Sequence, residues 1–227
     1  MTVRRAIRAL PAAWVFCAFQ APGQSTPADV PAQAAVSMPA PAAGEAGKSW
    51  AFSASLYGYI LPDSPDYLQP TVTADRGGLH LEARYNYEAP RTGSVWVGYN
   101  FSVGKDVTLE FTPMLGGVFG DTTGIAPGYT FTLSWWKLQL YSQGEFVVDA
   151  AAWADSFFYT WSELTLAPAD WFRFGLVIQR TKLYQTDLGI QRGVLAAFTY
   201  RTLDLSAYVF NPDESTPVFV VALGLTF

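Results

Sequence analysis

The sequence contains one histidine, His80, in the stretch "LHLEARYNYE", and this residue is the first candidate for chemistry. Acyl transfer by a serine needs a general base within hydrogen-bond reach, usually a histidine oriented by a third polar group. The residues that follow His80 are Leu81 and Glu82, so the next position on the same face of a strand holds an acid rather than a serine. A solvated histidine near a turn explains the pattern without a catalytic role. We therefore predict no catalytic residue.

Carboxylates and metal ligands are the other residue types that could support a reaction. Glu110 and Glu145 could act as a pair in glycoside hydrolysis, but they lie on separate predicted strands and the sequence does not fix their distance. The only cysteine, Cys17, lies near the start of the chain, and no calcium loop of the DxDxDG type occurs. The turns "DRGG" and "GDTTG" precede no predicted helix, so they form no phosphate site. The sequence predicts no metal site and no cofactor.

The composition excludes several classes of protein. Half of the residues (50%) are hydrophobic and 16% are aromatic, whereas only 15% are charged, and the formal net charge is −5. A nucleic-acid-binding face would need excess positive charge. No run of about 18 consecutive apolar residues occurs, which a membrane-spanning helix requires. A chain that is apolar enough for a membrane but has no helical span favours a transmembrane β-barrel.

The first 48 residues differ in composition from the rest. Residues 1–23 combine Arg4, Arg5 and Arg8 with a short apolar core and a small-x-small site, as in an export signal peptide. Phe16 precedes Cys17 where a lipoprotein signal has a small residue, which argues against lipidation. Residues 24–48 are rich in Pro and Ala and have no apolar period, so we expect a disordered linker. Residues 49–227 are left for the folded domain.

From Trp50 onward the dominant pattern has a period of two, which is the period of a half-buried strand. In "LHLEARYNYE", Leu79, Leu81, Ala83, Tyr85 and Tyr87 share one face, and the polar residues between them share the other. The stretches "VTLEFT" and "TLDLSAYVF" repeat this alternation. The predicted strands are 50–61, 67–75, 79–88, 93–103, 106–118, 127–136, 138–149, 156–167, 170–182, 190–201, 203–210 and 216–227.

The connections between these twelve strands alternate in length. Tight connections such as "DRGG" and "APAD" alternate with longer, more polar ones such as "GDTTGIAP" and "NPDES". Membrane barrels have short periplasmic turns and long outer loops in this order. An even number of strands also places both ends of the domain on one side. The fold class predicted is all-β, a transmembrane antiparallel up-and-down barrel of about twelve strands.

The last strand carries a further signature. Phe227, Leu225, Leu223, Val221 and Phe219 share one face of "VFVVALGLTF", and Phe227 is the last residue. This strand resembles the C-terminal strand of bacterial outer-membrane β-barrel (porin-like) proteins. The resemblance implies that the barrel-assembly machinery reads this strand and that it pairs with the first strand, so that no edge remains.

Aromatic residues gather near the predicted strand ends, where amphipathic rings favour the headgroup region of a membrane. A core of ordinary aromatics in a soluble sandwich is the alternative, although a sandwich would not need the alternation of connections. The residues concerned are Trp50, Tyr67, Tyr99, Tyr129, Trp135, Trp153, Trp171, Tyr184 and Tyr200.

The polar faces of the strands would line the interior. Arg84 and Arg173 are expected to pair there with glutamates, because buried charges must pair or stay hydrated. This network either holds the barrel together or lines a slightly cation-preferring aqueous path, and both interpretations stay open. The predicted lumen-lining residues are Glu82, Arg84, Glu110, Gln139, Tyr141, Gln143, Glu145, Tyr159, Trp161, Glu163, Arg173 and Asp204, with His80, Gln179 and Tyr208 on the same faces.

These patterns predict an integral protein of the Gram-negative outer membrane that is not an enzyme. The leading functional hypothesis is a narrow porin-like channel for passive passage of small solutes. A non-conducting structural or surface-binding barrel is the alternative, and an outer-membrane lipid-modifying enzyme comes third. The expected partners are outer-membrane lipid, lipopolysaccharide near loops such as that with Asp213 and Glu214, the assembly machinery through Phe227, and small solutes. Nothing in the sequence fixes the oligomeric state.

Overall fold

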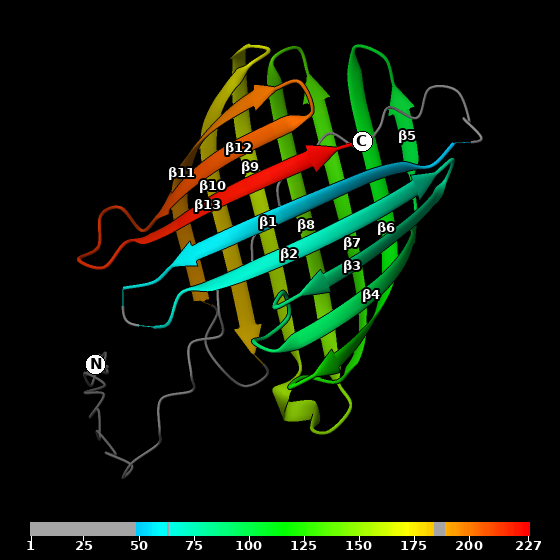
Figure 1. Cartoon of the computed structure of the whole chain (residues 1–227), viewed down its shortest axis with the longest axis vertical. Helices are drawn as coiled ribbons and strands as arrows, with labels where there is room; N and C mark the ends of the chain where they lie inside the picture. The colour runs from blue at the N-terminus through cyan, green and yellow to red at the C-terminus, as the bar shows by residue number, and fades with distance from the viewer. Residues whose placement is uncertain (1–48, 63, 184–188) are drawn as a thin grey trace, which may run out of the picture. The chain divides into compact units, whose positions relative to one another are not determined.

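The computed structural model describes residues 49–62, 64–183 and 189–227, and these form one β-barrel (Figure 1). The predicted signal peptide, the predicted linker and Tyr184 lie outside the described residues. No helix in the described part of the chain is long and apolar enough to cross a membrane. The strands are β1 (Ala51–Ile60), β2 (Tyr67–Arg76), β3 (Leu79–Tyr85), β4 (Thr92–Tyr99), β5 (Phe101–Gly104), β6 (Val107–Gly120), β7 (Gly124–Trp135), β8 (Leu138–Asp149), β9 (Phe157–Ala169), β10 (Phe172–Leu183), β11 (Gly189–Tyr200), β12 (Leu203–Phe210) and β13 (Val218–Thr226), with a short 3-10 helix, η1 (Trp153–Asp155), between β8 and β9.

The barrel closes where its first and last strands meet. β1 and β13 pair antiparallel from Ser53 with Thr226 to Ile60 with Phe219. The backbone N–H of Phe52 donates to the carbonyl oxygen of Phe227 at 2.9 Å, and the N–H of Phe227 donates back at 3.0 Å. β4 and β5 both pair with β6 and form one strand interrupted at Asn100, so twelve strands cross the barrel, as predicted. Closure leaves no free sheet edge.

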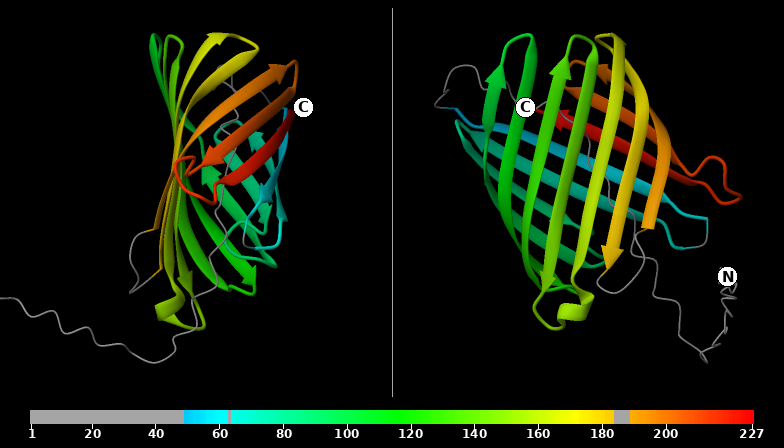
Figure 2. Two further views of the ribbon diagram at one scale, coloured as in Figure 1. Left: turned by 90° about the vertical axis from the view of Figure 1, so that its left-hand side faces the viewer. Right: turned by 180° about the vertical axis from the view of Figure 1, so that it is seen from behind.

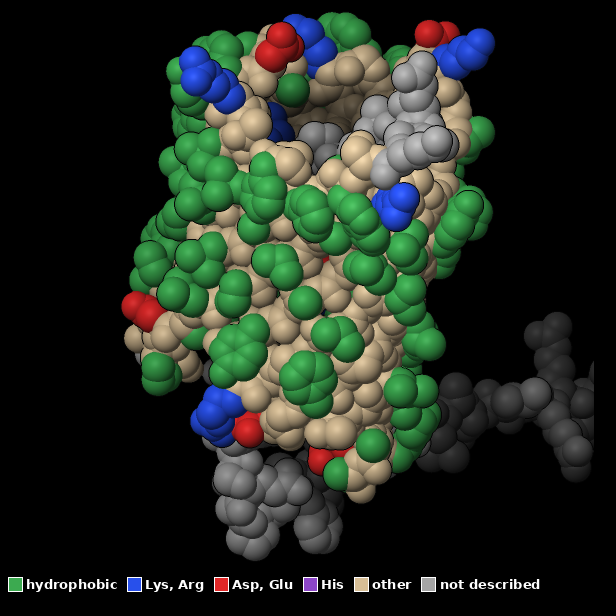
Figure 3. Space-filling view, turned by 45° about the vertical axis from the view of Figure 1, so that its right-hand side comes forward, with side chains coloured by type: hydrophobic (Ala, Val, Ile, Leu, Met, Phe, Trp, Pro, Cys, Tyr) green, Lys and Arg blue, Asp and Glu red, His purple; other side chains and the backbone are tan. Residues whose placement is uncertain are grey.

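The two faces of each strand differ as the alternation predicts. Leu79, Leu81 and Tyr85 of β3 are exposed on the outer face, whereas Arg84 is buried inside. The outward residues of β13 are likewise exposed and apolar. Figure 3 shows apolar side chains spread over the outer wall and a hollow at one end. An apolar outer wall, with charged and polar side chains on the inner face, is the reverse of a soluble domain and suits a bilayer.

The two ends of the barrel differ in their connections. One end, here called the tight-turn end, carries the start of β1, the end of β13 and the short turns, which are drawn at the top of Figure 1. The other end, here called the loop end, carries the longer connections and η1. The views in Figure 2 show the same division from the side and from behind. This agrees with the predicted alternation of connections.

Three predicted strand boundaries were wrong. The strand predicted at 79–88 ends at Tyr85, because Asn86 adopts a left-handed conformation (φ 55°) that breaks the alternation. Tyr87, predicted on the outer face, is therefore buried inside the barrel. The predicted loop 120–127 is also too long, since β6 runs to Gly120 and β7 begins at Gly124. Gly120 belongs to β6 and residues 124–127 belong to β7, so the turn contains only residues 121–123.

The aromatic residues predicted at strand ends mostly face outward. Trp135, Trp153, Trp171 and Tyr200 are exposed near the ends of their strands. Tyr67 does not belong to this outer set, because its ring stacks on Tyr59 inside the barrel with centroids 4.5 Å apart. The prediction for Tyr67 was wrong because strand-end position alone does not show which way a side chain points.

Candidate functional site: the lumen

Large side chains fill the interior from the middle of the barrel to the loop end. Trp161 is fully buried, and its indole meets the rings of Tyr208 and Phe210 edge-on at centroid distances of 5.3 and 5.1 Å. Tyr208 also stacks on Tyr57, and Tyr87 meets Tyr159 edge-on. These residues belong to one continuous buried cluster that draws on strands all around the barrel. We call it the aromatic cluster, and its rings come from Tyr57, Tyr59, Tyr87, Trp96, Tyr141, Phe157, Tyr159, Trp161, Tyr208 and Phe210.

Towards the tight-turn end the interior is polar and contains cavities. One cavity of about 130 Å³, here called the vestibule, is lined by hydroxyl, amide and acidic side chains that include Asp75, Glu82 and Glu110, together with His80 and the rings of Phe52 and Phe131. No lysine or arginine is among the described residues that line it. A second cavity of about 530 Å³ opens to solvent beside Arg173 and Asp204, and Thr226 borders both cavities. The lumen is therefore a polar space that ends at a packed constriction.

Arg84 connects strands that are not neighbours in the sheet. Its Nη1 donates to Oε2 of Glu145 on β8 at 2.8 Å, and its Nε donates to Oε1 of Glu82 at 2.7 Å. The guanidinium carbon lies 4.1 Å from the ring centre of Tyr87 and 4.3 Å from that of Trp96. Tyr87 in turn accepts a hydrogen bond from the amide of Gln143. These contacts span the lumen and close it at this level.

Glu88, in the connection between β3 and β4, also lies beside the guanidinium of Arg84. Its Oε1 accepts a hydrogen bond from Ser94 and lies 4.0 Å from Nη1 of Arg84. The side chain is fully buried, and burial away from water raises the pKa of its carboxyl. We call Tyr87, Trp96, Glu82, Glu88 and Glu145, which surround the guanidinium of Arg84, the Arg84 cage.

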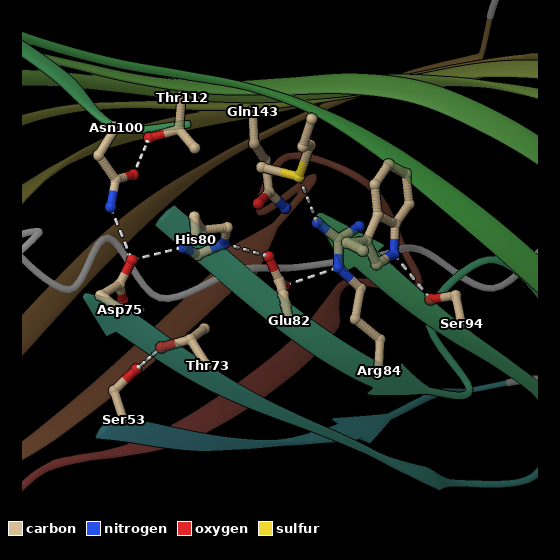
Figure 4. Close-up of polar contacts among 12 residues, drawn as sticks. Ser53, Thr73, Asp75, His80, Glu82, Arg84, Ser94, Asn100, Thr112 and Gln143 are labelled. Carbon is tan, nitrogen blue, oxygen red and sulfur yellow. Dashed lines mark hydrogen bonds and ion pairs between the residues drawn. The ribbon is translucent and has the colours of Figure 1, made fainter. Parts of the chain in front are cut away.

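A chain of polar contacts leads from the vestibule to the Arg84 cage (Figure 4). Asn100 donates from its amide to Asp75 at 2.7 Å, and its amide oxygen accepts from Thr112. His80 contacts Asp75 through Nδ1 at 2.8 Å and Glu82 through Nε2 at 3.3 Å, and Glu82 then binds Arg84. Both partners of His80 shown here are carboxylates, so its ring has the surroundings of a structural ion-pair residue.

Arg173 makes a separate ion pair in the second cavity. Its two Nη groups donate to the two carboxylate oxygens of Asp204, with Nη2 and Oδ1 2.9 Å apart. Ser206 and Thr199 add further hydrogen bonds to this pair. The expected glutamate partners were right for Arg84, which binds Glu82 and Glu145, and wrong for Arg173. Asp204 follows the turn after β11, and the register of β10, β11 and β12 brings it to Arg173.

The structure places the twelve predicted lumen residues on the interior faces of their strands. Four border the vestibule and three border the second cavity, while the others are buried around the Arg84 cage or in the aromatic cluster. The vestibule residues are Glu82, Glu110, Tyr141 and Gln143; those of the second cavity are Gln139, Arg173 and Asp204; the buried ones are Arg84, Glu145, Tyr159, Trp161 and Glu163.

Tyr159, Trp161 and Tyr208 of the aromatic cluster were predicted to face the lumen, but other aromatic residues that narrow it were not predicted. Tyr57 and Tyr59 of β1 and Trp96 of β4 lie on inward faces, and the alternation in "SLYGYI" and "SVWVGY" could have revealed them. Glu88 lies on the polar face of the predicted strand 79–88, so the alternation indicates it, whereas Tyr87 could not be found in this way because the left-handed Asn86 breaks the alternation.

No group of three or more His, Cys, Asp or Glu in the described part of the chain is placed to hold a metal ion. Exposed ion pairs occur at the loop end instead. Arg192 donates to Asp213 at 2.6 Å, and this hydrogen bond lowers the pKa of the Asp213 carboxyl. Arg91 pairs with Asp121 in the same exposed manner. Such pairs contribute little to stability.

The fold and the interior define the class of this molecule as a closed, porin-like β-barrel of twelve strands. Solved structures of the KdgM porin share this fold. One covers 77% of this chain and 99% of its own with a TM-score of 0.54 and 11% identity. A second, titled as the KdgM porin in complex with disordered oligogalacturonate, has a TM-score of 0.55, 10% identity and the same coverage. No protein-family model and no curated protein matches the sequence.

Proposed function

We propose that this chain is a narrow porin-like channel of the Gram-negative outer membrane through which small solutes pass without energy input. The observation that carries the proposal is the polar vestibule inside a closed barrel whose outer wall is apolar. Hydroxyl and amide groups along such a path replace the water that a polar solute loses on entry. The porin fold of the similar structures supports the same conclusion.

The constriction sets the size of the path. Twelve strands give a bore between that of small filled barrels and that of wide porins, so side-chain volume decides how much space remains. Here the Arg84 cage and the aromatic cluster occupy the loop-end half. We therefore expect small conductance steps rather than the large steps of an open bore, and passage requires movement of these side chains.

The charge of the lumen favours cations and neutral solutes over anions. Asp75, Glu82 and Glu110 line the vestibule, and His80, which contacts Asp75 and Glu82, is the one basic residue among its described lining residues. The oligogalacturonate bound by the KdgM porin is an acidic oligosaccharide, and an acidic vestibule repels such a solute. We do not propose that ligand for this chain.

Conductance in planar lipid bilayers tests the channel. The refolded barrel should give small discrete steps, and Tyr87→Ala should enlarge them, because the Tyr87 ring reaches into the lumen beside Arg84. Tyr85→Ala is the matched control, since Tyr85 lies two residues away on the exposed outer face and its loss should leave the steps unchanged. Silence of both the wild type and Tyr87→Ala would remove the channel function.

A non-conducting structural barrel is the second candidate, and one observation favours it. The aromatic cluster is continuous across the lumen, with Trp161 and Phe210 completely shielded from solvent. Small barrels filled in this way serve as stable membrane anchors for their loops. The same bilayer experiment decides between the two, because a purely structural barrel stays silent after its lumen is widened.

The remaining parts of the proposal concern export and partners. Residues 1–23 would direct export, residues 24–48 would form a linker, and β13 with Phe227 would be read by the assembly machinery. Lipid and lipopolysaccharide would contact the outer wall and the loop end. A lipid-modifying enzyme receives no support from His80, whose partners named above are Asp75 and Glu82. Localisation in membrane fractions with and without residues 1–23 tests the export signal.

A further inference from the structure

The Arg84 cage has the chemistry of a binding site for organic cations. Planar or quaternary cations are bound in proteins between aromatic faces, because the negative face of each ring attracts positive charge. The guanidinium carbon of Arg84 contacts two such rings, 4.1 Å from the centre of Tyr87 and 4.3 Å from the centre of Trp96. Both rings are themselves buried, so the contacts are desolvated and strong.

The cage also contains more acidic groups than its own arginine can satisfy. Three carboxyl groups, those of Glu82, Glu88 and Glu145, lie within 4.0 Å of one guanidinium. Oε2 of Glu88 and Oε1 of Glu145 are buried and have no hydrogen-bond donor among the described residues. Buried acceptors without a donor are costly, so a second cation entering the cage would gain hydrogen bonds that the fold leaves unmade.

Arg84 also controls passage at this level of the lumen. Its bridge to Glu145 joins β3 to β8, and the aromatic cluster lies beyond it. A solute that moves through must displace the guanidinium and would leave the carboxylates unpaired. Removing one partner of a buried ion pair is strongly unfavourable, because the other charge stays buried without compensation. A cationic solute removes that cost by taking the place of Arg84, whereas an anion or a neutral sugar does not.

We propose that the Arg84 cage binds organic cations that carry a guanidinium or ammonium group, and that such solutes pass by exchange with Arg84. Binding in the cage is independent of transport, whereas the exchange step rests on the proposed channel function. Burial raises the pKa of Glu88, so an entering cation also competes with a proton at that carboxyl. The groups that face Glu88 there are Arg84, Glu82, Ser94 and, across the lumen, Glu145.

Chemical rescue tests the binding site directly. Arg84→Ala removes the guanidinium and should lower the thermal stability of the refolded barrel. Millimolar guanidinium chloride should restore a large part of the lost melting temperature, while equal concentrations of sodium chloride or urea should not. Arg173→Ala is the matched control, because Arg173 pairs with Asp204 and no cation–π contact of Arg173 occurs among the described residues.

The outcomes of the rescue experiment are distinct. Recovery in Arg84→Ala alone supports the cage, and so does refolding of this variant only when guanidinium is present. Equal recovery in Arg173→Ala, or no recovery in either variant, overturns the proposal. An Arg84→Ala variant that fails to refold both with and without guanidinium overturns it as well.

Reversal potentials of the unaltered protein test the exchange step. In a gradient of guanidinium chloride the cation should carry most of the current, and Glu88→Gln with Glu145→Gln should reduce its preference over chloride about tenfold or more. Asp204→Asn is the control outside the cage. A preference for the anion overturns the exchange step. Absence of current from the unaltered protein overturns the exchange step, and recordings of Tyr87→Ala then decide whether the channel function fails as well. The rescue result still decides whether the cage binds cations.

Discussion

Replacement of Trp161 by alanine should be among the most damaging changes to this barrel. Trp161 is fully buried and makes edge-on contacts with Tyr208 and Phe210. Its indole N–H also donates to Oε1 of Glu163 at 2.8 Å. Glu163 keeps a hydrogen bond from Tyr208 at 3.1 Å after the change, so the carboxylate is not left without a donor. The cost is therefore mainly one of packing.

The magnitude follows from these contacts. Each aromatic pair is worth about 0.5–1.5 kcal/mol beyond the area it buries. Truncation of a buried tryptophan to alanine costs about 3–5 kcal/mol in all, including the space left behind. We expect the free energy of unfolding to fall by about 4 kcal/mol, since both ring contacts and one hydrogen bond are lost together.

Equilibrium unfolding in urea measures this loss. The refolded barrel in lipid vesicles would be followed by far-UV circular dichroism and by the gel shift between folded and unfolded forms. Trp136→Ala is the matched control, because Trp136 is 79% exposed in the turn between β7 and β8. It should change the free energy of unfolding by less than about 0.5 kcal/mol. Equal losses in the two variants would refute the idea that the loop-end half is a packed core.

Three further predictions concern the backbone, the closure of the barrel and pH. Gly175→Ala should lower the folding yield, because a Cβ there would lie 2.1 Å from the backbone oxygen of Leu164, whereas Gly117→Ala, which meets nothing within 4 Å, should refold like the wild type. Phe227→Pro removes the backbone N–H that donates to Phe52 of β1, so gel-shift assays should show slower and less complete refolding. Unchanged refolding would contradict the role of this hydrogen bond in closing the barrel between β1 and β13. Burial raises the pKa of Glu88, so its protonated carboxyl contributes stability at a pH below the usual glutamate pKa, and this contribution is lost as the pH rises. The stability of Glu88→Gln relative to the wild type should therefore increase with pH. A difference in urea unfolding that does not depend on pH would contradict this prediction.

Much of the architecture could be predicted from the chain alone because it depends on local alternation. Leu79 and Leu81 must point opposite to His80 and Glu82 in any strand, so the choice of an apolar outer wall follows once the sheet closes. The spacing of turns gives the number of strands in the same way. The pairing of Phe52 with Phe227 follows from the need to leave no edge.

The interior of the barrel depended on the tertiary structure. Arg84 and Glu145 are 61 residues apart, and only the register of five strands brings their side chains together across the lumen. Tyr87 enters the barrel because one residue, Asn86, adopts a left-handed conformation, which period-two reasoning cannot detect. Alternation fixes the face from which a side chain leaves its strand, but the space that remains in the lumen depends on how side chains from opposite walls meet, and that is a property of the closed barrel.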